Sequence, residues 1–168
     1  MAYEMSTRCL SEGDFDVSVD DRYFEDYVPG SSYQYGHVVV SEAEILDFAR
    51  RFDPQPIHVD PARSVGGPFG GLIASGWHTG SLCMRMYVDH YVSHVASLAS
   101  PGMDELRWQR PVRPGDALSL RVTIESARVT RSRPDRGLVH TNLQLLNQDD
   151  ELAMSVRAMN FFGLRQPA

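Results

Sequence analysis

Lysine is absent from this sequence, and all 16 of its basic residues are arginine. Cysteine is scarce: Cys9 and Cys83 lie far apart, so the chain offers neither a disulfide framework nor a zinc cluster, and a reducing cytoplasm is the expected location. No uninterrupted apolar run is long enough to span a bilayer, and the acidic N-terminal residues lack the basic start and apolar core of a signal peptide. We therefore expect a cytoplasmic protein with no membrane partner.

Positive charge is in deficit overall, because the net charge is −6, which argues against a nucleic-acid partner. The charge is also unevenly spread. Residues 1–60 carry 13 acidic residues against four arginines, whereas residues 107–136 carry eight arginines against three acids. The arginine-rich stretch could bind phosphate groups through bidentate hydrogen bonds, or it could be the solvated face of strands.

Length and composition predict one domain. The chain has 168 residues, of which 42% are hydrophobic and 23% charged, values ordinary for a single globular unit. It contains no internal repeat and no low-complexity tract. We assign residues 1–168 to one domain, in which residues 1–20 form a loose or edge-packed N-terminal extension.

The clearest helix is expected over "SEAEILDFARRF". Ser41, followed three residues later by Glu44, makes a capping box that starts a helix. The helix should end at Asp53, because the residue before Pro54 is disfavoured in helical dihedral angles. Its apolar residues fall on one stripe: Ile45, Phe48, Ala49 and Phe52.

A second helix and several strands follow. From about Ser75, the segment "SGWHTGSLCMRMYVDHYV" has helical length and is apolar on nearly all sides, as if enclosed, and Gly76 and Gly80 would let a neighbouring backbone approach closely. Residues 117–126 alternate between apolar and polar side chains, and residues 137–162 read as two strands joined at a polar turn. The predicted class is α+β, with one long buried helix against an antiparallel sheet.

Asp53 and His58 are the first candidate pair for chemistry. They flank a segment stiffened by Pro54 and Pro56, which would hold an acid and a base at one fixed separation. At a helix C-terminus, Asp53 faces unpaired carbonyl groups, which disfavours an ionised carboxylate. Histidine exchanges protons near neutral pH, so the pair could share general acid–base catalysis. The alternative is a helix-ending aspartate and a loop histidine that satisfies backbone groups.

Ser75 and Gly76 form a second candidate site. If Ser75 caps the second helix, the Gly76 amide lies unpaired in its first turn, where it could donate a hydrogen bond to a developing oxyanion. The alternative is an ordinary cap in which glycine permits close packing. His90 and His94 are four residues apart but lack the glutamate of a metalloprotease helix, and no phosphate-loop, dinucleotide or nucleophile-elbow pattern occurs. We expect no metal and no redox cofactor.

Three stretches together resemble the MaoC-like dehydratases, a group that includes R-specific enoyl-CoA hydratases. "SEAEILDFARRFDPQPIHVDP" is similar to the family's helix followed by D-x-N-P-x-H-x-D-P. "FGGLIASGWHTGSLCMRM" is similar to its loop into the central helix, and "LRWQRPVRPGDALSLRVTI" to its R-x-x-x-P-V-x-P-G-D strand pair. The resemblance spans roughly residues 38–125.

The resemblance implies a hot-dog fold, in which an antiparallel sheet wraps a long central helix, and at least a homodimer. It implies reversible addition of water to the 2,3-double bond of an acyl thioester, either a coenzyme A or an acyl-carrier thioester, without a metal or cofactor. Asp53 and His58 would be the catalytic pair, and Gly76 would donate its amide to the thioester carbonyl. Gln55 stands where the family has an asparagine that helps to hold the water.

Other residues are candidates for substrate binding. The lid "SVGGPFGG" could admit the acyl chain, and the arginine-rich region could meet the phosphates of coenzyme A. The candidates are Gln55, Ser75, Phe69, Trp77, Arg107 and Arg110. Two other functions remain open: a hot-dog acyl-CoA thioesterase, and a non-catalytic acyl-binding protein on the same fold. The length and branching of the acyl chain are not encoded in these motifs.

Overall fold

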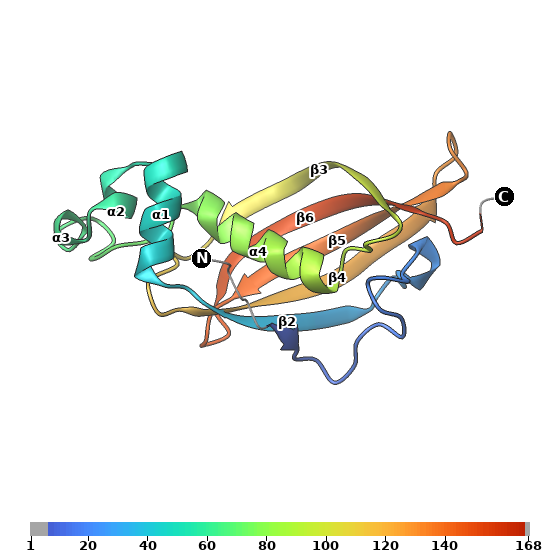
Figure 1. Ribbon diagram of the computed structural model, residues 1–168, viewed down its shortest axis with the longest axis horizontal. Coiled ribbons are helices and arrows are strands. Elements are labelled where there is room, and N and C mark those ends of the chain that lie inside the picture. Colours follow the sequence, from blue (N-terminus) through green and yellow to red (C-terminus); the bar gives the residue numbers. More distant parts are fainter. Residues whose placement is uncertain (1–6, 167–168) are drawn as a thin grey trace.

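The computed structural model describes residues 7–166, within which six strands form one sheet. The strands lie in the order β1-β2-β4-β5-β6-β3, and every pairing is antiparallel (Figure 1). Their bounds are β1 Arg8–Cys9, β2 Ser32–Val39, β3 Ser97–Trp108, β4 Ala117–Val129, β5 Arg136–Leu146 and β6 Leu152–Gly163. The long strand β3 therefore forms one edge of the sheet.

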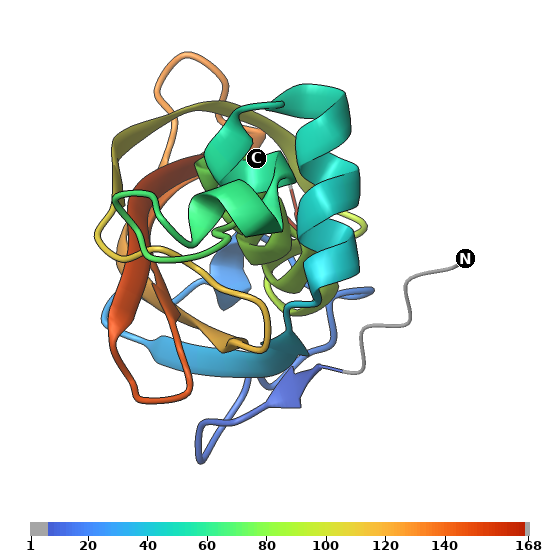
Figure 2. The same ribbon diagram turned by 90° about the vertical axis from the view of Figure 1, so that its left-hand side faces the viewer.

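The central helix α4 (Gly76–His90) lies along the inner face of the curved sheet (Figure 2). Strand β4 shows why: its alternating residues Leu118, Leu120, Val122 and Ile124 are fully buried beneath the helix. Residues on the same face of β5 and β6, and Leu82, Met86 and Tyr87 of α4, complete this core. A helix cradled by an antiparallel sheet is the hot-dog arrangement, so the predicted fold is confirmed.

Three shorter helices gather at the N-terminal end of α4: α1 (Glu42–Phe52), α2 (Pro56–Val59) and α3 (Pro61–Ser64). The predicted capping box is present, because Ser41 accepts a hydrogen bond from the Glu44 amide and the Glu44 carboxylate accepts one from the Ser41 amide. Ile45 and Ala49 are buried as expected, whereas Phe52 is exposed. The proline-rich stretch after Asp53 is not a simple connector, since Pro56 opens the helical turn α2.

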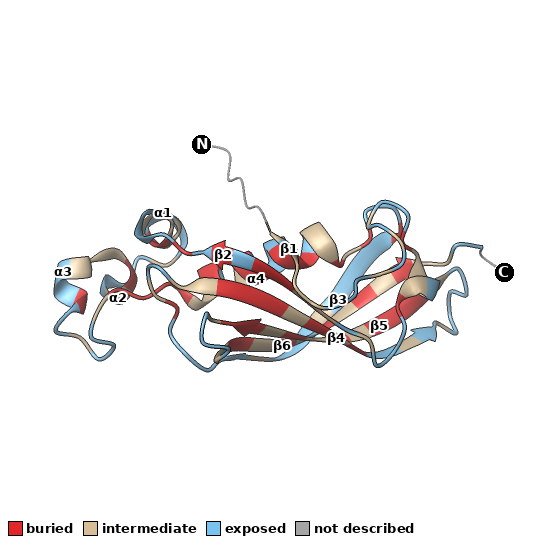
Figure 3. Ribbon diagram, turned by 90° about the horizontal axis from the view of Figure 1, so that it is seen from below, coloured by how far each residue is buried: buried red, intermediate tan, exposed pale blue. Residues whose placement is uncertain are grey.

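The sheet covers only one side of α4. Trp77, Met84 and Val88 on its other side are exposed, as is much of β3 (Figure 3). The expectation that other structure encloses this helix on nearly all sides is therefore wrong for the single chain. The expected backbone approach at the two glycines is also wrong: Gly80 has no neighbour where a Cβ would be, and a side chain, that of Trp108, covers Gly76.

The segment before β2 begins at the other edge of the sheet and then reaches an inner strand. Strand β1 pairs with β2, and the short 3-10 helix η1 (Phe24–Asp26) lies against β5. Residues 7–20 of the predicted extension belong to this layer, and residues 1–6 lie outside the described part of the chain. No helix within residues 7–166 is long and apolar enough to cross a bilayer, and the cytoplasmic location stays a prediction.

Candidate active site

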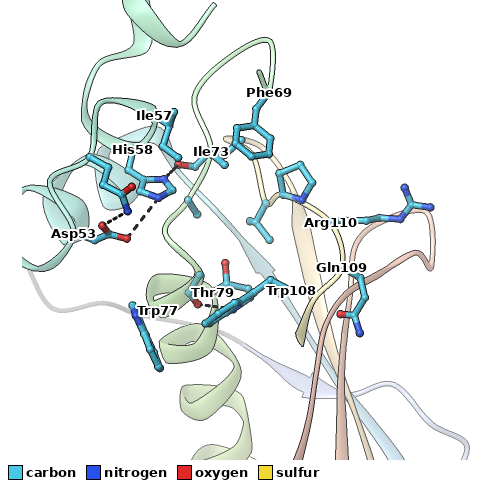
Figure 4. A pocket seen from close by; sticks show the side chains of 15 residues that line it. Asp53, Ile57, His58, Phe69, Ile73, Trp77, Thr79, Trp108, Gln109 and Arg110 are labelled. Carbon is cyan, nitrogen blue, oxygen red and sulfur yellow. Dashed lines mark hydrogen bonds and ion pairs between the residues drawn. The ribbon is translucent and has the colours of Figure 1, made fainter. Parts of the chain in front are cut away.

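A cavity of about 440 Å³ opens where α1, α2 and the N-terminus of α4 meet the end of β3 (Figure 4). This volume is within the range typical of small-molecule sites. Its wall contains the predicted residues Asp53, His58 and Gly76 together. The remaining wall is mostly apolar and aromatic, and it includes Ile57, Phe69, Ile73, Trp77, Trp108 and Val112.

His58 is held in one tautomer by its backbone partner. Its Nδ1 lies 2.9 Å from the carbonyl oxygen of Ile73, which can only accept, so Nδ1 carries the hydrogen. In the neutral ring, Nε2 therefore presents a lone pair. This Nε2 lies 3.5 Å from Oδ2 of Asp53, and the two side chains face one another at the cavity wall (Figure 4). The arrangement brings two hydrogen-bond acceptors together, as a site for a shared water requires.

Both oxygens of the Asp53 carboxylate receive a hydrogen bond. The Ser75 hydroxyl donates to Oδ2 at 2.6 Å, and the Gln55 amide donates to Oδ1 at 2.7 Å. These two bonds, the Ser75 bond first, lower the pKa of the Asp53 carboxyl below its ordinary value. The expectation that the helix terminus would disfavour the ionised carboxylate is therefore wrong, because specific donors outweigh the carbonyl groups of α1.

The first turn of α4 lies directly beside this pair. Ser75 is the N-cap residue, as predicted, and its Oγ accepts a hydrogen bond from the Trp77 amide at 3.2 Å. The amide of Gly76 donates to no acceptor within residues 7–166, so it remains an available donor at the cavity wall. The indole NH of Trp108 donates to the Gly76 carbonyl oxygen at 3.0 Å, and a Cβ on Gly76 would lie 2.6 Å from the Trp108 ring.

The predicted substrate-binding residues divide into two groups. Gln55, Phe69, Trp77 and Arg110 contribute to the cavity wall. Ser75 and Arg107 do not: Ser75 is fully buried behind the wall, and the Arg107 guanidinium donates to the carbonyl oxygen of Leu106. The arginine-rich region is also divided, because Arg128, Arg131, Arg133 and Arg136 lie around the β4–β5 turn, at the far end of the sheet from α1 (Figure 1).

Sequence reasoning missed several residues of this site. Trp108 and Thr79 line the cavity, and the Arg113 guanidinium donates to the Phe69 carbonyl oxygen, which ties the glycine-rich loop to the segment after β3. All three lie in stretches that resemble the family, Thr79 in "FGGLIASGWHTGSLCMRM" and Trp108 and Arg113 in "LRWQRPVRPGD", but no residue pattern there marked them individually. Residues 7–166 contain no group of three or more His, Cys, Asp or Glu side chains that could hold a metal ion.

Comparison with known proteins identifies the family. The family described as "MaoC like domain" matches residues 26–144. The crystal structure of a MaoC-like dehydratase from Rhodospirillum rubrum is 34% identical in sequence, with a TM-score of 0.78 over 86% of this chain and 99% of that chain. An (R)-hydratase from A. caviae shares the fold at 21% identity, with a TM-score of 0.63 over 82% of this chain and 96% of that chain.

The 3-hydroxyacyl-thioester dehydratase Z of Mycobacterium tuberculosis is 38% identical over 77 residues, which are 45% of this chain and 51% of that protein. The matched region thus spans about half the length of that relative. The family match covers most of the described chain and includes the whole cavity wall. This chain therefore belongs to the MaoC-like domain family.

Proposed function

We propose that this protein is a hydro-lyase that reversibly adds water to the 2,3-double bond of an enoyl thioester. One observation carries the proposal: His58 Nε2 and Asp53 Oδ2 lie 3.5 Å apart at the wall of a cavity that also contains Gly76. Two acceptors and one free amide donor are the groups that this reaction needs. The acceptors bind and deprotonate water, and the donor stabilises charge on the thioester oxygen.

The proposed steps conserve atoms and charge. A water molecule donates one hydrogen bond to Asp53 and one to His58. Its oxygen bonds to C3 of the substrate while His58 Nε2 takes a proton, and the double-bond electrons move toward the thioester oxygen, which the Gly76 amide stabilises. The imidazolium then returns its proton to C2, which leaves a 3-hydroxyacyl thioester and a neutral imidazole. Dehydration is the same sequence reversed.

The relatives support this class of reaction. A dehydratase of 3-hydroxyacyl thioesters and an (R)-hydratase are both similar to this chain. The aromatic and aliphatic wall of the cavity suits an acyl chain. Arg110, which forms an ion pair with Glu151 at the rim, is a candidate contact for the phosphates of a coenzyme A or carrier-protein thioester.

The test is turnover of short and medium 2-enoyl-CoA esters, followed by loss of the absorbance of the conjugated thioester. We expect wild-type protein to hydrate at least one ester and His58→Ala to lose nearly all of this activity, because the proton acceptor is gone. A parallel thiol assay separates the thioesterase alternative, which would release free coenzyme A. Binding of the esters without turnover of any kind would favour the non-catalytic acyl-binding protein and contradict the proposal.

We further propose that two copies of the chain form a homodimer. Four exposed apolar residues of α4 and β3 line one groove, and β3 is an unpaired sheet edge within the described residues: the four are Trp77, Met84, Met103 and Trp108. A second copy would cover this surface. Light scattering after gel filtration should give the mass of a dimer, and Met103→Asp should shift it toward a monomer.

A further inference from the structure

The Ser75 hydroxyl connects the two halves of the site. Asp53 and His58 come from the segment that ends α1 and forms α2, whereas the Gly76 amide belongs to α4. Ser75 Oγ donates its single hydrogen to Asp53 Oδ2 at 2.6 Å and accepts the Trp77 amide at 3.2 Å. One buried oxygen thus joins the carboxylate to the first turn of the helix that carries the amide donor.

A helix cap explains only part of this geometry. Capping α4 uses a lone pair of Oγ to accept an amide, and it makes no use of the hydroxyl hydrogen. That hydrogen points instead to a carboxylate 22 residues earlier in the chain. The other donor to Asp53, the Gln55 amide, comes from an exposed residue, whereas Ser75 is fully buried. The Ser75 bond is therefore the more rigid of the two.

We propose that Ser75 is a positioning residue, which holds the Asp53 carboxylate against His58 and at a fixed separation from the Gly76 amide. The expected loss of kcat rests on the proposed hydration activity, whereas the expected shift in the Asp53 titration does not. Ser75 does not line the cavity, so it would act through Asp53. Its contribution should therefore appear in the chemical step rather than in substrate binding.

Three variants separate positioning from capping. Ser75→Ala removes both roles, Ser75→Thr keeps both, and Ser41→Ala removes a serine cap from α1 at the end remote from Asp53. A hydrogen bond to a charged group is worth about tenfold to a hundredfold in an equilibrium constant, so we expect kcat to fall by about that factor in Ser75→Ala. KM should change little, Ser75→Thr should recover most of kcat, and Ser41→Ala should leave kcat unchanged.

A second readout does not depend on activity. The Asp53 carboxyl can be followed by its carbon-13 chemical shift during a pH titration, with Asp53→Asn to assign the signal. Ser75 lowers the pKa of this carboxyl, so Ser75→Ala should titrate at higher pH than wild type, whereas Ser75→Thr and Ser41→Ala should match wild type. If Ser75→Ala does not fold, Ser75→Gly removes the hydroxyl at little cost to the cap.

The outcomes distinguish this proposal from the proposed function. If no enoyl ester is hydrated but the Asp53 titration moves in Ser75→Ala, the hydratase assignment fails and the positioning role stands. An Asp53 titration identical in wild type and Ser75→Ala would overturn the positioning role, whatever the activity. Equal losses of kcat in Ser75→Ala and Ser41→Ala would also overturn it, because helix capping alone would then explain the effect.

Discussion

The two ends of the central helix α4 are both surrounded by polar and charged groups, but only one end opens onto a cavity. At the N-terminal end, the ionisable pair Asp53 and His58 faces the cavity beside the Gly76 amide. At the C-terminal end, Arg22 is 2% exposed and donates to the carbonyl oxygens of His90 and Tyr91 at 2.8 and 2.9 Å. That end is closed by packed aromatic rings.

The comparison separates groups used for chemistry from groups used for stability. In both places the charge complements the helix dipole, with a carboxylate at the positive end and a guanidinium at the negative end. The carboxylate keeps a side open to the cavity, so its charge remains available to a ligand. The guanidinium gives its hydrogen bonds to the carbonyl oxygens at the helix C-terminus, of which that of Tyr91 also accepts the Tyr27 hydroxyl. Substitutions at the N-terminal end of α4 should therefore lower activity more than stability, and substitutions at the C-terminal end should lower stability more than activity.

The largest expected effect is on activity, from Asp53→Asn. Asparagine has nearly the same shape but carries no charge to orient water or stabilise an imidazolium, so kcat/KM should fall by about 10²–10⁴-fold. The melting temperature should change little, because the amide oxygen can still accept the Ser75 hydrogen bond and only the exposed Gln55 amide loses its acceptor. Enoyl-CoA hydration and thermal unfolding of the same preparation check both parts. A large loss of stability with the activity retained would reverse the comparison.

The next largest effect is on stability, from Arg22→Ala. This change leaves the carbonyl oxygens of His90 and Val17 without a side-chain donor, whereas that of Tyr91 keeps the Tyr27 hydroxyl. Since each unsatisfied group costs about 1–3 kcal/mol, we expect the two to lower the free energy of unfolding by about 2 kcal/mol or more, measured with urea. Specific activity of the folded fraction should be unchanged. Arg165→Ala is the matched control, because Arg165 pairs with Asp21 and Asp26 at the surface and should contribute far less.

The sequence predicted elements whose signals are local. The helix that begins after Ser41 has its caps and its stop within the same segment, and β4 alternates cleanly between its two faces. Most of strand β3 was not predicted, and only its last residues, from Leu106, fell in the stretch that resembles the family's strand pair. As an exposed edge strand containing Pro101 and Gly102, it has no apolar alternation. The sequence predicted a stiff connector where Pro56 begins the helical turn α2, although proline is common at the first position of a helix.

The sequence predicted some residues of the cavity wall but not their hydrogen bonds. The resemblance to the family motif placed Asp53, His58 and Gly76 at one site, and all three line the cavity. The resemblance could not reveal that Ser75 donates to Asp53, because that contact joins residues brought together only by the packing of α4 against α1. The buried Arg22 was equally hidden, since a charged residue near the N-terminus normally lies in solvent. Local sequence patterns do not predict contacts between segments that are distant in the chain.

A smaller effect is expected where the open end of α4 is tightly packed. In Gly76→Ala, the new Cβ would lie 2.6 Å from the Trp108 ring, so the indole or the first turn of α4 must move. We expect a loss of about 1–3 kcal/mol in the free energy of unfolding, together with a lower kcat, because the amide donor moves with the turn. Gly80→Ala is the matched control, since its Cβ would meet nothing within 4 Å.

In Gly80→Ala the helix should gain up to about 1 kcal/mol, because alanine is the better helix former. The activity should be retained, since Gly80 does not line the cavity that contains Asp53 and His58. Urea unfolding and hydration assays on both variants test the difference. If Gly76→Ala were as stable and as active as Gly80→Ala, the close contact between Trp108 and the first turn would have no role in the site.

The smallest effect concerns His78, which is sealed although it lies at the open end of α4. It stacks on Phe48 of α1 at 5.0 Å, and its Nδ1 has no partner within residues 7–166. Burial lowers the pKa of this histidine, and the nearby Glu44 opposes the shift only in part. The folded protein therefore resists protonation of His78, whereas the unfolded chain accepts a proton at about pH 6.5.

Stability should consequently fall as the pH decreases through that value, because the unfolded state then binds more protons. His78→Phe keeps a ring against Phe48 and removes the titration, so its free energy of unfolding should fall less between about pH 7.5 and about pH 5.5, with a difference of at most about 1.4 kcal/mol per pH unit. Burial also lowers the pKa of His90, which therefore contributes equally to both proteins and cancels in the difference. Parallel curves for the two proteins would mean that enclosure by α1 and α4 does not keep His78 neutral.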